Sequence, residues 1–138
     1  MDWLVWALLS ALFAGLTAVL AKVGVKDVDA NLATAVRTVV ILLFAWAIAL
    51  APGLPEFGKI TGKTWLFLVL SGLATGASWL CYFRALKLGD ASRVAPVDKL
   101  SVVVAMTLAV IFLGERLSWQ QWLAGGLIVS GTIILAYS

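Results

Sequence analysis

The sequence predicts an all-α membrane protein with five transmembrane helices. Of its 138 residues, 63% are hydrophobic and only 12% are charged, whereas soluble domains carry about 25% charged residues. The mean hydropathy of +1.07 indicates several membrane spans. The apolar residues gather in five continuous runs of about 20 residues, long enough to cross about 30 Å of hydrocarbon as helices and too long for strands.

The polar stretches between the runs have the chemistry of helix ends. Asp29 or Asn31 is available as the N-cap of the second helix, and Gly89 is placed to stop the third. Ser118 and Gln121 form the S-x-x-Q pattern of a capping box before the last run. A single transmembrane domain over residues 1–138 is therefore expected, with helices at 3–23, 31–51, 65–86, 91–113 and 119–137.

Tryptophan and basic residues predict how the helices are oriented. Trp3, Trp65 and Trp119 each open an odd-numbered helix, so all three fall at one membrane face, as in an interfacial aromatic belt. The opposite face carries Lys22, Lys26, Arg84, Lys87 and Arg93, whereas the tryptophan face carries Lys59, Lys63 and Arg116. This excess places the opposite face in the cytoplasm and the two termini on different sides. Because the excess is small, insertion in both orientations (a dual topology) is an open alternative to this fixed orientation.

The first run has no basic segment before it and no small-residue cleavage site after it, so a retained helix is expected rather than a signal peptide. An odd number of spans also has a consequence for assembly. Two copies in opposite orientation make a ten-helix unit with inverted symmetry, an arrangement that many secondary transporters carry within one chain. No internal repeat is visible within this sequence, so we expect one inverted-repeat half of a ten-helix transporter.

Composition argues against an enzyme. The sequence has no histidine and one cysteine, Cys81, and no acid pair or nucleophile–base set is visible, so neither a metal nor another cofactor is expected. The segment 58–64, GKITGKT, has three residues between its glycines, where a phosphate-binding loop needs four. The sequence has 10 Lys+Arg against 7 Asp+Glu. In a membrane protein this mild basic excess relates to which loops face the cytoplasm, so no nucleic-acid partner is expected.

Three charged residues lie inside predicted spans, roughly 10 Å deep: Arg37 in the second helix, and Asp98 and Lys99 in the fourth. Inserting a charged side chain at the centre of a transmembrane helix costs about 2.5–3.5 kcal/mol, so the presence of each of these residues requires an explanation. Arg37 and Lys99 are long enough to extend to the headgroups. Alternatively, the fourth helix begins at Pro96, which makes Asp98 an interfacial first-turn acid. In the interpretation that we favour, Asp98 pairs with Arg37, and Lys99 remains as positive charge inside the bundle.

Two further patterns lie within the spans. Thr75, Trp79 and Tyr82 follow the i, i+4, i+7 spacing of one helix face, with Ser78 beside them, which is typical of a small-molecule cavity wall and also of ordinary bundle packing. Pairs of small residues separated by three others occur in two of the predicted helices. They are Gly72 and Gly76 in the third helix, and Gly126 and Ser130 in the last. They predict close helix packing within the chain, and the last helix is the candidate for a dimer seam.

Several segments resemble a known family. "ALKLGDASRVAP" (85–96) followed by "LGERL" (113–117) is the most specific combination, and "WALLSALFAGLTAVLAKVGV" (6–25) and "AVRTVVILLFAWAIAL" (35–50) extend the match over nearly the whole chain. The sequence resembles EamA-type members of the drug/metabolite transporter superfamily, especially their short single-repeat bacterial and archaeal group. Small multidrug resistance relatives use a first-helix glutamate for proton coupling. Residues 4–21 contain no acid, which disfavours that type of antiport.

The resemblance implies that two repeats in opposite orientation form an exporter or exchanger of small metabolites, with the third and fourth helices lining the route. We therefore expect a multi-pass transporter of the inner cell membrane that works by alternating access. It would act as an antiparallel homodimer or with a sibling half-transporter, on an amino-acid-like or carboxylate-bearing substrate. The expected substrate-binding residues are Arg37, Thr75, Ser78, Trp79, Tyr82, Pro96, Asp98 and Lys99. The alternative is a non-transporting membrane subunit or a lipid-linked flippase component.

Overall fold

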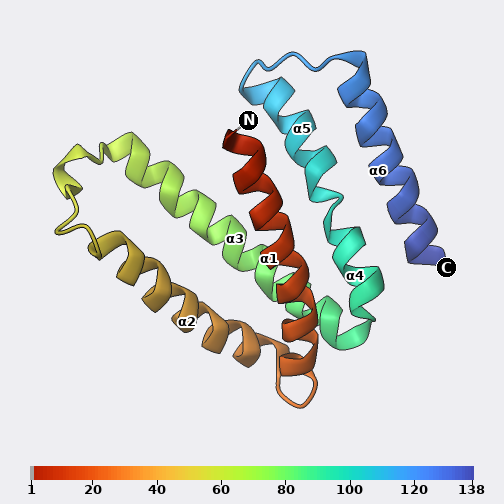
Figure 1. Ribbon diagram of the computed structural model, residues 1–138, viewed down its shortest axis with the longest axis horizontal. Helices are drawn as coiled ribbons and strands as arrows, with labels where there is room; N and C mark the ends of the chain where they lie inside the picture. Colours follow the sequence, from red (N-terminus) through yellow and green to blue (C-terminus); the bar gives the residue numbers. More distant parts are fainter. Residues whose placement is uncertain (1) are drawn as a thin grey trace. The chain divides into compact units, whose positions relative to one another are not determined.

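The computed structural model describes residues 2–138, and the regular elements in that range are all helices (Figure 1). In chain order they are α1 (Asp2–Val25), α2 (Ala30–Leu50), the 3₁₀ helix η1 (Phe57–Lys59), α3 (Gly62–Leu88), α4 (Ala91–Asp98), α5 (Ser101–Phe112) and α6 (Trp119–Tyr137). Because α4 and α5 together occupy the fourth predicted span, the predicted all-α fold with five transmembrane regions is confirmed.

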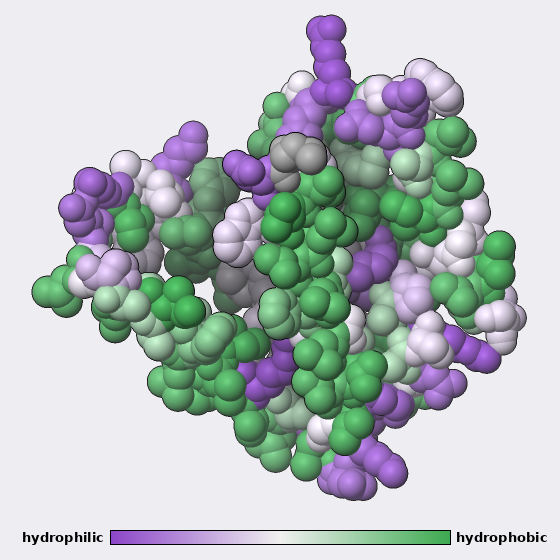
Figure 2. Space-filling view, in the orientation of Figure 1, coloured by the Kyte–Doolittle hydropathy of each residue, from purple (hydrophilic) through white to green (hydrophobic). Residues whose placement is uncertain are grey.

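The helices have the length and the surface of membrane spans. Four regions are both long and apolar enough to cross a bilayer: α1, α2, α3, and the range Ala91–Phe112 that contains α4 and α5. α6 has 19 residues and is about 28 Å long, but two glutamines, Gln120 and Gln121, lower the hydropathy of its first turn. Most large apolar side chains are exposed, and Figure 2 shows hydrophobic residues over most of the visible face. Such a surface suits contact with lipid rather than water.

Two helix starts follow the capping chemistry that the sequence indicates. At α2 the N-cap is Asp29, whose carboxylate accepts a hydrogen bond from the Leu32 amide at 3.1 Å. At α6 both halves of the capping box are present: Ser118 Oγ accepts from the Gln121 amide, and the Gln121 side chain accepts from the Ser118 amide. α3 ends at Leu88, directly before Gly89, as expected. These contacts set where polar loops give way to apolar helices.

The fourth span is broken, which the sequence-based range 91–113 does not show. α4 begins at Ala91 with Pro96 inside it and ends at Asp98, and α5 begins at Ser101. At the break, the amides of Lys99 and Leu100 bond to carbonyls three residues earlier, at 3.0 Å each. These tighter turns follow a proline that has no amide hydrogen to donate. Since α4 begins before Pro96, the alternative in which the helix begins at Pro96 is wrong.

The chain forms two compact units, each described by itself. The first joins the N-terminal part of α1, up to Leu20, with Leu88–Ser138, and in it α6 packs against both α4 and α5. Gly125 of α6 is buried there, and a Cβ at this position would lie 3.4 Å from the Met106 methyl of α5. The predicted small residue Gly126 instead has open space beside it. Close packing of α6 therefore uses the neighbouring glycine.

Polar contacts also join α6 to the broken span. The Thr132 hydroxyl of α6, whose residue is 5% exposed, lies 2.7 Å from the Ile128 carbonyl of its own helix and 3.4 Å from the Pro96 carbonyl of α4. A hydroxyl has one hydrogen, so the shorter contact is the principal bond. The second contact places a polar side chain of α6 beside the proline that precedes the break.

The second unit, Ala21–Lys87, contains the end of α1, all of α2 and most of α3. Its buried residues lie where α1 ends, α2 begins and α3 ends: Ala21, Val25, Ala30, Thr34, Phe83 and Leu86. Val25 and Leu86 are completely buried. This small core fixes the ends of three helices, and two clusters of functional interest lie against it.

Candidate functional site

The first cluster is built around Arg37 of α2. Its guanidinium carbon lies 4.8 Å from the centroid of the Trp79 ring and 5.2 Å from that of the Phe83 ring. Trp79 and Phe83 are four residues apart on α3, so they present neighbouring rings on one helix face. Each distance is within the about 6 Å range of a cation–π contact. The predicted site residues Arg37 and Trp79 are therefore brought together.

The guanidinium keeps its hydrogen-bonding capacity. Among residues 2–138, Arg37 forms no hydrogen bond and no ion pair, and none of its nitrogen atoms is fully buried. An arginine has five N–H donors in a fixed planar arrangement, which matches the two oxygens of a carboxylate. The aromatic rings thus hold a cation whose donors stay open to a ligand. Asp98, its predicted partner, belongs to the other compact unit, so that pairing stays a prediction.

The polar and aromatic face of α3 is only partly assembled. Trp79 and Tyr82 are half-buried, and the Tyr82 ring packs edge-on against Phe83, with ring centroids 6.4 Å apart. Thr75 lies one helical turn before Trp79, and Ser78 lies one turn before Tyr82. Both are exposed and line no described cavity. Phe83 was missed by the sequence-based reasoning because an apolar ring inside a span gives no signal of its own. Its spacing of four residues from Trp79 is the one pattern that points to it.

The remaining predicted residues lie at the break in the fourth span, within the other unit. Asp98 is the last residue of α4 and Lys99 is its C-cap. Both are exposed, while Pro96 is half-buried. In Figure 1 a short non-helical link joins the coiled ribbons of α4 and α5. Two opposite charges therefore stand where the helix is interrupted, beside backbone that departs from regular helical bonding.

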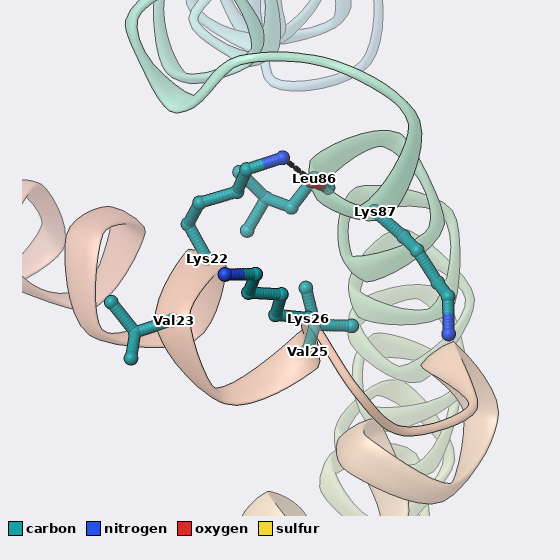
Figure 3. A pocket seen from close by; sticks show the side chains of 6 residues that line it. All are labelled: Lys22, Val23, Val25, Lys26, Leu86 and Lys87. Carbon is teal, nitrogen blue, oxygen red and sulfur yellow. Dashed lines mark hydrogen bonds between the residues drawn. The ribbon is translucent and has the colours of Figure 1, made fainter.

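A second cluster is a pocket that the sequence-based reasoning did not predict. A cavity of about 460 Å³ lies within the second unit, where α1 and α3 end, and its lining comprises Lys22, Val23, Val25, Lys26, Leu86 and Lys87. The ammonium group of Lys22 donates to the Leu86 carbonyl at 2.6 Å, and that of Lys87 donates to the Val28 carbonyl. Figure 3 shows the Lys22 side chain reaching the Leu86 carbonyl, and the Lys87 side chain directed away from Lys22 and Lys26.

The described residues provide no metal centre: within 2–138, no three His, Cys, Asp or Glu side chains gather where they could hold an ion. Cys81 is a free, exposed thiol.

The family described as "EamA-like transporter family" matches residues 1–137. A protein of Sinorhizobium sp. named "Uncharacterized transporter in cobO 3'region" is 58% identical over 136 residues, which cover 98% of this chain and 96% of that protein. No solved structure matches the chain.

Proposed function

Because this chain belongs to the EamA-like transporter family, and is thus a multi-pass membrane transporter rather than an enzyme, we propose that it works as half of a secondary transporter. In this proposal residues 1–138 form one EamA-type domain. Two copies in opposite orientation, or this chain and a sibling, enclose a route for a small metabolite. Export or exchange then proceeds by alternating access to the two sides of the membrane.

The substrate class that we propose is a small metabolite with a carboxylate, such as an amino acid. The observation that carries this proposal is the aromatic clamp on Arg37: rings of Trp79 and Phe83 at 4.8 and 5.2 Å around a guanidinium whose donors have no protein acceptor among the described residues. A charged group in a membrane span is costly unless it is functional. A planar, oriented guanidinium binds a carboxylate through two parallel hydrogen bonds. In this assignment Trp79 and Tyr82 supply an apolar wall, and Thr75 and Ser78 supply hydroxyls.

The break between α4 and α5 supports a substrate route along the fourth span. Transporters commonly bind substrates and ions where a transmembrane helix is discontinuous, because interrupted backbone there lines a cavity. Here the interruption follows Pro96 and carries Asp98 and Lys99. We assign Lys99 a second contact with anionic substrate, and Asp98 the role of the one acid in the fourth span that is available for coupling.

The experiment is uptake of radiolabelled L-amino acids into proteoliposomes that contain only the purified chain. Each amino acid is compared with its amide, which lacks the carboxylate. We expect flux for one or more acids and little for the matching amides, loss of flux in Arg37→Gln, Asp98→Asn and Lys99→Ala, and full flux in Lys63→Gln, a lysine outside the proposed route.

Two results would reject the proposal in different ways. Equal flux of acids and amides, or full flux in the three site variants, would show that the assigned residues do not recognise a substrate carboxylate. An absence of flux for every compound, together with stoichiometric co-purification of a different polypeptide, would instead favour a non-transporting subunit or a lipid-linked flippase component.

A further inference from the structure

We propose that the pocket lined by Lys22, Lys26 and Lys87 binds a phosphate-bearing anion, for which the headgroup of an anionic phospholipid is the candidate that fits its lining. This lysine pocket lies apart from the Arg37 clamp in its chemistry. It has flexible ammonium groups in place of an oriented guanidinium, and it has no aromatic residue in its lining. Its binding of a ligand does not depend on the transport function proposed above.

The charge of the pocket is the first argument. Three of its six lining residues are lysines, and none is acidic. The two acids in the adjoining turn are not part of the lining. Asp29 is engaged as the N-cap of α2, and Asp27 forms no ion pair with a described residue. A concave site with ammonium groups and no acid in its lining attracts anions.

The lysines do more than neutralise helix ends. Lys22 bonds to the Leu86 carbonyl in the last turn of α3, where a cation compensates the partial negative charge of the helix dipole. Lys87 bonds to the Val28 carbonyl in the turn between α1 and α2. Lys26 has no such role, because it is exposed and forms no hydrogen bond or ion pair with any described residue. The pocket therefore offers donors that the fold does not use.

Position and lining favour a lipid. The pocket lies where α1 and α3, both candidate spans, reach their C-terminal ends, so it stands at the level of the headgroups. Besides the lysines its lining is apolar: Val23 is exposed at its side, and Val25 and Leu86 form a buried floor. Ammonium groups beside an apolar wall match a phosphate next to an acyl chain. Basic pockets between transmembrane helices are known sites for anionic headgroups.

The test is native mass spectrometry of the full, delipidated chain in detergent, titrated with phosphatidylglycerol or with phosphatidylcholine. We expect one tightly retained phosphatidylglycerol per chain and no comparable phosphatidylcholine. Lys26→Gln should weaken that retention about fivefold, since one lysine at a membrane surface contributes that much to anionic-lipid attraction. Lys26→Arg, which keeps the charge, should retain the lipid. Lys63→Gln is the matched loss of an exposed lysine elsewhere and should have no effect.

A further arm separates the two sources of phosphate. Displacement of the lipid by excess inorganic phosphate would support a free-phosphate site with the same ligand chemistry, and failure to displace it would support a lipid site. The proposal is overturned if Lys26→Gln binds phosphatidylglycerol as tightly as the unaltered chain, or if Lys63→Gln loses as much as Lys26→Gln. It is also overturned if neither phosphatidylglycerol nor inorganic phosphate binds. Because Lys26 is exposed and forms no hydrogen bond or ion pair with a described residue, circular dichroism should show the variant fully folded.

Discussion

Removing the aromatic face from Arg37 should cost a measurable coupling energy. The guanidinium carbon lies 4.8 Å from the Trp79 centroid, and both residues are half-buried. A cation–π pair contributes about 0.5–1 kcal/mol when exposed and about 2 kcal/mol when desolvated, so we expect about 1 kcal/mol here. Trp79→Leu alone also changes apolar packing, and Arg37→Met alone removes the cost of burying a charge. The pairwise energy therefore requires a double-mutant cycle.

The assay is reversible unfolding in mixed micelles with increasing dodecyl sulfate, followed by circular dichroism, for the unaltered chain, both single variants and the double variant. A second cycle combines Arg37→Met with Trp46→Leu. Trp46 lies on α2 and contacts Phe57 at 6.1 Å between ring centroids, not Arg37. The first cycle should give a coupling of about 1 kcal/mol, and the second should be additive within about 0.5 kcal/mol. Additivity in the first cycle, or equal coupling in both, would refute the aromatic clamp.

Three other substitutions should change stability in the same assay. Thr132→Val removes a buried hydroxyl but keeps the side-chain volume, so the free energy of unfolding should fall by only about 0.5–1 kcal/mol. Ser118→Ala removes half of the capping box of α6 and should cost about 1 kcal/mol. Gly125→Leu forces a side chain against Met106 and should cost about 1–3 kcal/mol, whereas Gly126→Leu meets open space and should stay within about 0.5 kcal/mol. Equal losses at the two glycines would contradict the packing described for α6.

Length and capping chemistry account for what the sequence predicts well. Continuous apolar runs fix the five helical regions, because membrane spans must be helical and about 20 residues long. Short polar patterns such as that of Ser118 and Gln121 mark helix starts, because the contacts involved are local. The second helix is capped by Asp29 for the same reason, because its carboxylate accepts a hydrogen bond from the Leu32 amide.

Tertiary geometry accounts for what the sequence does not predict. Pro96 signals a disturbed helix, but the break falls three residues later, where successive amides tighten their bonds. The choice of Gly125 over Gly126 depends on how α6 rotates against α5, which residue spacing alone does not set. Similarly, Arg37 is recognisable as a costly charge, yet its aromatic neighbour Phe83 looks like any other apolar residue in a span.

In the function that we propose, one chain supplies half of a transporter and meets a second copy in the opposite orientation. The most direct measurement is labelling of a cysteine at position 138 (Ser138→Cys in a Cys81→Ser background) with an impermeant maleimide, in intact cells and in inside-out vesicles. We expect each preparation to label a substantial fraction of the chains, because copies that pair in this way must insert in both orientations. Labelling confined to one preparation would show a single fixed orientation and would contradict self-pairing.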